Sequence, residues 1–381
     1  MVISKIITRD FVFAFVAQFA FSLSFFTLIP TLPIYLSRLK STETEIGILI
    51  GVSSVASLVF RPLVGRALLK TPERDFMLAG AILFTFTSLA YLFAHPFWPF
   101  LMVRIFQGIG LAFFFTASTT LIANISPEAH RGQSISYFFL AFNIAFALAP
   151  SMGMFMINQF NFTFLFLMCI GLSLCSYYFT THLNKREALP LDDSSPEDRS
   201  FLSRKALPPS IMSLCTHMIW GALTAFFPLY ALDHGVNNPG LFFAAFAVML
   251  ILGRSLGGRI LDLYSREKII SPCLTAYILS MIILAFSKTL FMFILVAIIW
   301  GAGNAFLIPA LVAFVIDLAG SSRGPALGTF TAISDLGVGL GAVIMGLVLC
   351  WTSYQVMFLC LALIGLINFL YFILFVRKRK F

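Results

Sequence analysis

Long stretches without a single charged residue constrain this chain more than any other feature. Residues 11–36 carry no charge, and neither do residues 76–103, where His95 is counted as a neutral imidazole. An α-helix needs about 20 consecutive apolar residues to cross the hydrocarbon core of a bilayer. Across the whole chain 60% of residues are hydrophobic and 11% are charged, which is more apolar surface than a soluble fold can bury. The sequence therefore predicts an integral membrane protein.

Charged loops and loops that contain Pro or Gly divide the apolar sequence into twelve predicted spans. Backbone groups in lipid must be hydrogen-bonded internally, so each span is expected to be an α-helix. The expected ranges are 11–36, 44–66, 76–94, 98–122, 133–158, 162–182, 207–232, 239–262, 270–287, 290–317, 325–350 and 354–376. We expect an N-terminal six-helix bundle at 1–182, a flexible cytoplasmic linker at 183–206, and a C-terminal six-helix bundle at 207–381 that ends in a short basic tail.

The distribution of Lys and Arg predicts the orientation of these spans. Of the 25 Lys and Arg residues, three lie on one side of the predicted membrane and three lie inside spans. The other nineteen lie on the opposite side, together with both termini. Because basic residues concentrate in cytoplasmic loops, both termini are expected to be cytoplasmic. The net charge of +9 is then a sign of orientation, and no nucleic-acid partner is expected.

The two halves of the chain repeat each other. The pattern Arg-x-Leu-x-Gly-Arg occurs at 61–66 and again at 254–259, 193 positions later. The pattern Gly-x-Gly-x-Ala-Phe occurs at 108–113 and returns at 301–306 with the same offset. Parallel repeats with a shared offset are typical of transporters whose halves are related by an axis along the membrane normal. The chain is therefore expected to be an all-α membrane protein of two pseudo-symmetric six-helix bundles.

Several motifs resemble those of the major facilitator superfamily, and the resemblance covers the whole chain. The family's loop motif Gly-x-x-x-Asp, followed by basic residues, is present at 258–262, while in the first half Leu69 replaces the aspartate. The motif Arg-x-x-Gln-Gly-x-Gly is complete at 104–110, and the opening Thr8-Arg9-Asp10-Phe11 is similar to bacterial arabinose-efflux and drug-efflux members. The resemblance implies transport of a small molecule by alternating access, usually coupled to a proton gradient, in the bacterial inner membrane.

The loop motifs predict a cytoplasmic gate that differs between the halves. Asp262 and Asp317 correspond to Leu69 and Asn124, so both acidic positions are missing together from the first half. We expect these aspartates to pair with Arg254, Arg259 or Arg323, and the first half to use Glu73, Asp75 or Glu128 instead; ordinary loop charges are the alternative. The candidate gate residues are Gly65, Arg66, Lys70, Arg74, Gly258, Arg259, Asp262, Arg266 and Asp317.

Two charged residues inside spans are candidates for coupling. Arg104 lies about six residues into its span, roughly 9 Å along the helix, where a charge is costly unless it has a partner or faces a polar cavity. It is either a structural cation or, as the resemblance implies, an element of proton or substrate coupling. Asp335 lies about 15 Å into its span, among glycines that allow close helix packing. Desolvation there suits a group that binds and releases a proton, and an Asp bonded between packed helices is the alternative.

Polar and amphipathic side chains inside other spans are candidate liners of a substrate cavity, because such groups need a partner other than lipid. They are Gln107, Asn143, His217, Trp220, Trp300 and Asn304, of which Asn143 is the repeat equivalent of Asp335. Packing residues with satisfied hydrogen bonds are the alternative. The helix-5 sequence Ala-Pro150-x-x-Gly153 resembles the antiporter element of the family, with Ala in place of the first Gly.

These patterns predict a secondary transporter that exports a small amphipathic organic solute in exchange for protons, with sodium as the alternative ion. An importer of a sugar, metabolite or metal complex with the same fold is the alternative function. We expect a monomer without a cofactor or bound metal. An enzyme is not expected, since His130, His182 and His234 stand alone and no nucleotide-binding Gly-x-x-x-x-Gly-Lys-Ser/Thr pattern occurs.

Overall fold

Twelve long α-helices make up this computed structural model, which describes residues 7–127, 131–185, 203–263, 266–319 and 323–376. Within these ranges it describes no side chains for 131–133, 254–263, 266–267, 319 and 323–325. The long helices are α2 (Arg9–Arg38), α3 (Glu43–Ala67), α4 (Glu73–Ala90), α5 (Trp98–Ile125), α6 (Arg131–Gln159), α7 (Phe162–Thr181), α8 (Leu207–Asp233), α9 (Gly240–Leu263), α10 (Arg266–Phe286), α11 (Leu290–Ala319), α12 (Arg323–Trp351) and α13 (Tyr354–Tyr371). A 3-10 turn, η3 (Arg204–Ala206), precedes α8, and a π-turn, η4 (Phe372–Val376), extends α13.

Ten of these helices are long and apolar enough to span a membrane by themselves. Of the other two, α9 is apolar over Gly240–Gly253, the part of this helix whose side chains the structure describes, and α4 begins with the charged residues Glu73, Arg74 and Asp75. The predicted spans agree with the helices to within about four residues at each end, once η4 is counted with α13. The predicted all-α fold with twelve helices is therefore confirmed.

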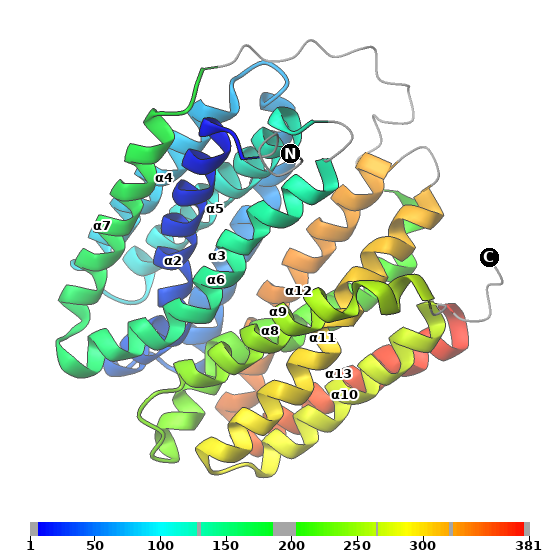
Figure 1. Ribbon diagram of the computed structural model, residues 1–381. Coiled ribbons are helices and arrows are strands. Elements are labelled where there is room, and N and C mark those ends of the chain that lie inside the picture. The colour runs from blue at the N-terminus through cyan, green and yellow to red at the C-terminus, as the bar shows by residue number, and fades with distance from the viewer. Residues whose placement is uncertain (1–6, 128–130, 186–202, 264–265, 320–322, 377–381) are drawn as a thin grey trace. The chain divides into compact units, whose positions relative to one another are not determined.

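Helix contacts divide the chain into two compact units, which are described separately. Unit 1 comprises Met1–Ser41 and Val52–Asp192, and unit 2 comprises Thr42–Gly51 and Asp193–Phe381. In unit 1, α2 packs on α6 and α7, and α4 packs on α5 and α7 (Figure 1). In unit 2, α8 packs on α12 and α13, and α10 packs on α11 and α13. The same set of helix pairs recurs six helices later, as a duplicated bundle requires.

Glycine contacts repeat between the units at the offset read from the sequence. In unit 1 Gly108 of α5 faces the carbonyl of Ser53 on α3, so closely that an added Cβ would overlap it. In unit 2 Gly301, 193 residues later, faces the carbonyl of Phe246, also 193 residues later, at 3.0 Å from an added Cβ. Small residues allow helix backbones to approach in this way. The pseudo-symmetry predicted from the repeats is thus present at the level of single contacts.

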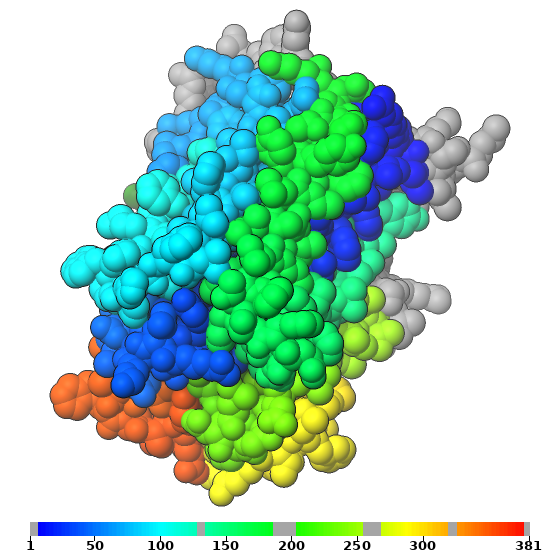
Figure 2. All heavy atoms as spheres, turned by 90° about the vertical axis from the view of Figure 1, so that its left-hand side faces the viewer, coloured from blue at the N-terminus to red at the C-terminus, as the bar shows by residue number. Residues whose placement is uncertain are grey.

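The exterior of unit 1 is apolar, as a lipid-facing surface should be. Figure 2 shows α7 in green as a continuous band beside the dark blue of α2, and α7 packs on both α2 and α4. Its exposed side chains include Phe164, Leu167, Leu174 and Tyr178. Large apolar groups exposed in such numbers indicate a surface whose solvent is lipid.

The described ends of the predicted linker belong to the units. Leu183 is buried, and the Asn184 amide donates to both carboxylate oxygens of Asp10 at 3.1 Å. Lys185 forms an ion pair with Asp75 at 3.8 Å. At the other end, residues 204–206 form η3 and continue directly into α8. Residues 186–202 lie outside the described part of the chain, so the flexibility predicted for them stays a prediction.

Candidate transport sites in the two helical units

Arg104 lies at the centre of a buried polar network in unit 1. It is the seventh residue of α5 and only 5% exposed. Its guanidinium Nη2 donates to Ser53 Oγ of α3 at 2.6 Å, and Nη1 donates to Oε1 of Gln107, one helical turn further along α5. The cation therefore has polar partners on its own helix and on a neighbouring one, which offsets much of the cost of burying its charge.

Tyr91 completes this network and fixes the orientation of the Gln107 amide. Tyr91 is the C-cap residue of α4, is fully buried, and donates its hydroxyl to Gln107 Oε1 at 2.7 Å. Gln107 Oε1 thus accepts from Tyr91 and from Arg104, so the amide oxygen faces both donors. Its Nε2 is buried and has no hydrogen-bond partner among the described residues. The network therefore holds a charge and one unused amide donor.

The equivalent network in unit 2 is aromatic instead of charged. Trp300 is the repeat equivalent of Gln107, and Phe246 is the equivalent of Ser53. Their rings lie 4.2 Å apart, and Trp220 of α8 adds a third ring 5.6 Å from Trp300. Asn304, one turn after Trp300, donates to the Tyr277 hydroxyl of α10. An apolar aromatic wall thus occupies the place that the cation occupies in unit 1.

A second polar cluster lies between α8 and α12 in unit 2. The Oγ atoms of Ser213 on α8 and Ser334 on α12 are 2.5 Å apart. His217, one turn after Ser213, places Nδ1 at 2.9 Å from the Ser213 carbonyl and 3.1 Å from its hydroxyl. Asp335 follows Ser334 directly and acts electrostatically on the imidazole of His217. Two ionisable groups near the middle of their helices are thus brought together.

Glycines on α12 make this close contact possible. An added Cβ on Gly337 would lie 2.6 Å from the Leu214 carbonyl and 3.0 Å from His217 Cβ. Gly341, one turn later, faces the carbonyl of Met218 even more closely. Because the contacted atoms are mostly backbone, a larger residue would push the two helices apart.

The predicted cavity liners fall into two groups. Gln107 and Trp300 have no exposed surface, so they do not line a cavity in this conformation. Asn143, His217, Trp220 and Asn304 are partly exposed. In the predicted antiporter element Pro150 is buried, and Gly153 lies against the Thr27 carbonyl of α2, 2.8 Å from an added Cβ. That element therefore packs α6 on α2.

The predicted gate residues are described mainly in the first half. Gly65 has no neighbour within 4 Å of an added Cβ, Arg66 and Lys70 are exposed, and Arg74 donates to the Thr181 carbonyl at 2.7 Å. In the second half Asp317 is exposed. The side chains of Gly258, Arg259, Asp262 and Arg266 lie outside the described residues, as do those of Arg254, Arg323 and Glu128.

Glu73 and Asn124 form a contact that bears on the missing acids. Asn124, which stands where the second half has Asp317, donates its amide to Glu73 Oε1 at 2.5 Å. Glu73 is the first residue of α4 and is buried, whereas Leu69 is 42% exposed. The carboxylate at this end of unit 1 is therefore supplied from α4, and an asparagine at 124 can donate to it where an aspartate would repel it.

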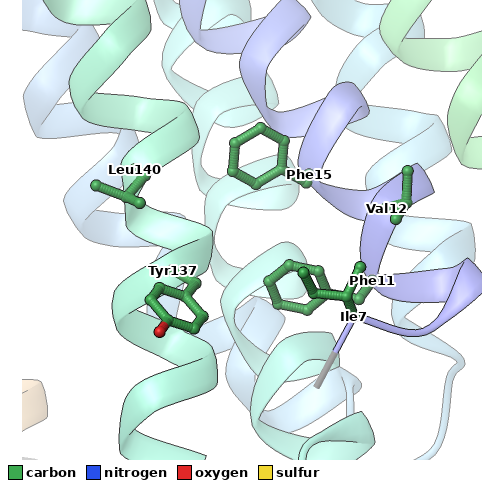
Figure 3. Close-up of a pocket in the computed structure, with 6 residues that line it drawn as sticks. All are labelled: Ile7, Phe11, Val12, Phe15, Tyr137 and Leu140. Atoms are coloured by element: carbon green, nitrogen blue, oxygen red, sulfur yellow. The ribbon is translucent and has the colours of Figure 1, made fainter. Parts of the chain in front are cut away.

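An apolar groove lies between α2 and α6 in unit 1 (Figure 3). Its volume is about 360 Å³ and its lining is almost wholly apolar. It is lined by Ile7, Phe11, Val12, Phe15, Tyr137 and Leu140. The groove offers no charged group, and no cluster of three His, Cys, Asp or Glu side chains suitable for a metal occurs in the described part of the chain.

Sequence reasoning missed the residues that position Arg104 and His217. Ser53 and Tyr91 belong to different helices from Arg104, and nothing in their local sequence marks them as its partners. Ser213 could have been found, since a serine four residues before His217 lies on the same helical face. Its contact with Ser334 depends on the packing of two helices distant in the sequence.

Twelve helices in two repeated bundles, with polar groups buried inside each, are the architecture of a multi-pass membrane transporter. The family model of the Major Facilitator Superfamily matches residues 14–263 and 210–381, and the chain belongs to this family.

Two relatives from Staphylococcus aureus are similar along most of the sequence. The staphylopine export protein is 25% identical over 345 residues, and the quinolone resistance protein NorA is 22% identical over 333 residues. Each alignment covers 84% of this chain and 84% of the relative.

Solved structures share the fold at lower identity. The nucleoside transporter NupG matches with a TM-score of 0.80 at 16% identity, covering 98% of this chain and 100% of that one. A POT family transporter in complex with 5-aminolevulinic acid matches with a TM-score of 0.84 at 13% identity, covering 98% and 97%.

Proposed function

We propose that this transporter exports a small amphipathic organic solute from a bacterial cell in exchange for protons. It would act as a monomer in the cytoplasmic membrane, with both termini in the cytoplasm and a six-helix bundle on each side of the 183–206 linker. The observation that carries the proposal is the pair of His217 on α8 and Asp335 on α12, both partly buried and both near the middle of their helices. An ionisable group inside a membrane span is expensive, and a role in ion coupling explains why it is there.

The relatives support the direction of transport and the type of solute. One relative is named for export of staphylopine, and another is named for resistance to quinolones, which export of the drug would provide. Trp220 supports an amphipathic solute, since it is partly exposed, packs against the buried rings of Phe246 and Trp300, and could stack on a flat, partly apolar molecule.

Arg104 and Asp335 would have different roles in the cycle. Arg104 is always charged, so it would act by changing its hydrogen-bond partners within the network of Ser53, Gln107 and Tyr91. Asp335 can be neutral or charged, so it would carry the proton inward while solute moves outward. Gln107, Asn143, His217, Trp220, Trp300 and Asn304 would form the walls of the solute site or the layer behind them. Pro150 and Gly153 would keep α6 packed on α2 during the cycle.

The cytoplasmic ends of the helices would form the inner gate. We propose that Asp262 and Asp317 pair with nearby arginines in the second half. In the first half the Glu73–Asn124 contact and the Asp75–Lys185 ion pair would take the corresponding role. Gly65, Arg66, Lys70 and Arg74 would form the loop that hinges there, with Gly258, Arg259 and Arg266 at the equivalent place.

Transport by purified protein in liposomes tests the proposal. A panel of amphipathic solutes that begins with a fluorescent quinolone is loaded, and accumulation is followed with and without an imposed pH gradient. We expect accumulation that depends on the gradient and is lost in Asp335→Asn. The matched control is Asp233→Asn, which changes an exposed carboxylate at the last residue of α8.

Two outcomes would contradict the proposal. Flux of the wild-type protein that ignores the pH gradient, or Asp335→Asn flux that equals that of the control, would remove the proton coupling. Accumulation of solute inside intact cells instead of loss from them would favour the importer with the same fold. Replacement of the pH gradient by a sodium gradient separates the two coupling ions.

A further inference from the structure

We infer that His217 is a second proton-binding group of this transporter, that its Nε2 atom takes the proton, and that Asp335 supplies the opposing charge. The inference rests on the proposed proton coupling and adds a residue, an atom and a partner to it. Nothing in the family match or in the relatives' names assigns this role to a histidine on α8. A hydronium ion on one side gives its proton to Nε2, so that one O–H bond breaks as the N–H bond forms, and water on the other side later takes the proton and becomes hydronium.

The Ser213 carbonyl determines which imidazole nitrogen can take the proton. Nδ1 of His217 lies 2.9 Å from this carbonyl oxygen, within hydrogen-bond distance. A carbonyl oxygen can only accept, so Nδ1 must carry the hydrogen of the neutral ring. The neutral imidazole then has its lone pair on Nε2. Nε2 is therefore the atom that gains and loses a proton.

The nearby hydroxyls are arranged as a chain that ends at a carbonyl. Ser213 Oγ lies 3.1 Å from Nδ1 and accepts from it, so its own hydrogen is free to point at Ser334 Oγ, 2.5 Å away. Ser334 donates in turn to the Phe330 carbonyl at 2.7 Å. The hydrogens of Nδ1 and of both serine hydroxyls are thus all used, and the Phe330 carbonyl at the end of the chain has no proton to pass on. This chain holds the tautomer in place and does not offer a path for protons through Nδ1.

Nε2 is left available on the other side of the ring. It has no hydrogen-bond partner among the residues that the structure describes, and the His217 side chain is partly exposed. A nitrogen with a free lone pair and access to water can be protonated, whereas one bonded to a protein donor cannot. The geometry thus separates a fixed face of the imidazole from an open one.

Asp335 provides the charge that makes an imidazolium tolerable at this depth. His217 is the eleventh residue of α8, about 15 Å from its start, and Asp335 is at the thirteenth position of α12, about 18 Å from its start. A lone positive charge there would be costly, and a carboxylate on the facing helix offsets that cost. The close approach of α12 at Gly337, opposite His217 Cβ, brings the two groups together.

The other elements packed on α8 bring no competing charge to this point in the described part of the chain. From α13, the neutral amide of Asn368 donates to the Met212 carbonyl at 3.0 Å. From α11, the neutral ring of Trp300 contacts Trp220. The basic residues of η3, Arg204 and Lys205, are exposed and lie at least twelve residues before His217. Asp335 is the charged group that acts on the imidazole.

The equivalent positions of unit 1 hold no ionisable group. Gln18 and Ser22 are the repeat equivalents of Ser213 and His217, 195 residues earlier. Gln18 Nε2 donates to Ser22 Oγ at 2.8 Å, so the same two positions are hydrogen-bonded to each other. Asn143 stands in place of Asp335. The hydrogen bond between the two positions is shared, whereas the described side chains at these positions form an ionisable pair in unit 2 and a neutral one in unit 1.

Nitrogen NMR of the full-length protein in nanodiscs tests the assignment without any substrate. With ¹⁵N-labelled histidine there are five imidazoles to resolve, and His217→Gln identifies the one in question. We expect His217 to show the Nδ1–H tautomer when neutral and to protonate at Nε2. At about pH 6.5, the ordinary midpoint of a histidine, we expect the imidazolium fraction to fall severalfold in Asp335→Asn. The Nε2–H tautomer, or a fraction unchanged by Asp335→Asn, would overturn the inference.

Transport in liposomes provides the second arm, with a fluorescent quinolone as the probe. We expect His217→Gln to lose accumulation driven by a pH gradient while it retains exchange of labelled for unlabelled probe at equal pH. His234→Gln is the matched control, because His234 makes the same 2.9 Å Nδ1 bond to the carbonyl four residues earlier, at the end of α8. Equal gradient-driven accumulation in His217→Gln and His234→Gln would count against a role for His217.

The two proposals can fail separately. If the wild-type protein ignores the pH gradient, the proposed coupling fails, whatever His217 does. If the gradient drives the wild type and Asp335→Asn is inactive while His217→Gln is not, the coupling stands and the inference about His217 is wrong. Should His217→Gln fail to fold, replacement of the other four histidines one at a time identifies the His217 signal by elimination, and the NMR comparison of wild type with Asp335→Asn still decides.

Discussion

The hydrogen bonds around Arg104 predict a clear order of stability among three substitutions. Tyr91→Phe removes one donor to Gln107 Oε1, but this oxygen keeps its bond from Arg104, so no acceptor is left bare. We expect a loss of about 1 kcal/mol in the free energy of unfolding, the net value of one such bond. Gln107→Met keeps the length of the side chain and removes the acceptor, which leaves both the Tyr91 hydroxyl and the Arg104 guanidinium without it. We expect a loss of about 3–5 kcal/mol, because one of the abandoned groups is charged.

Thermal unfolding of the purified protein in one detergent measures this order. Tyr35→Phe is the matched control, because the Tyr35 hydroxyl makes only a 3.3 Å bond to the Tyr91 carbonyl and is partly exposed. Its loss should be smaller than that of Tyr91→Phe. If Tyr91→Phe destabilises as much as Gln107→Met, the network does not act through a shared acceptor, and the reasoning is refuted.

Substitutions at two further places test the contact between α8 and α12 and the contact between Glu73 and Asn124. Gly341→Ala should destabilise the protein by about 1–3 kcal/mol, because its Cβ would meet the backbone of Met218. Gly328→Ala on the same helix meets nothing within 4 Å and should be neutral or stabilising by a few tenths of a kcal/mol. Equal melting temperatures for the two variants would contradict the close contact between α8 and α12. Glu73→Ala should destabilise more than Glu73→Gln, since glutamine still offers an oxygen to Asn124; thermal shifts that do not distinguish the two would show that the contact is only a surface one.

The fold could be predicted from the sequence because the bilayer leaves few choices. An uncharged stretch of 20 or more residues must be a helix, and loops rich in charge or Pro mark its ends. The largest errors in the boundaries fall at the ends of α4 and at the start of α10. At their starts α4 and α10 continue into the charged residues Glu73 and Arg266, which a search for apolar runs excludes, whereas at its other end α4 stops at Ala90, four residues before the predicted end at 94.

The candidate sites could be predicted only in part, because the sequence shows which residues are charged but does not show which residues contact them. Arg104 and Asp335 stand out in the sequence as charges inside spans. The partners that fix Arg104, such as Ser53 and Tyr91, are ordinary residues on other helices, and only packing selects them. The sequence shows that acids are missing at Leu69 and Asn124, but it offers Glu73, Asp75 and Glu128 equally as replacements, and only the structure shows that the Asn124 amide donates to Glu73.

The repeat shows how one ancestral bundle can be divided into two roles. The positions of Ser53 and Gln107 hold a buried cation in unit 1, and their equivalents Phe246 and Trp300 hold stacked rings in unit 2. The reverse holds for a second pair of equivalent positions, on α8 and α2. Unit 2 has the ionisable His217 bonded to Ser213, and unit 1 has the neutral Gln18–Ser22 pair. A charge that never changes and a charge that can be switched off are thus carried by different bundles.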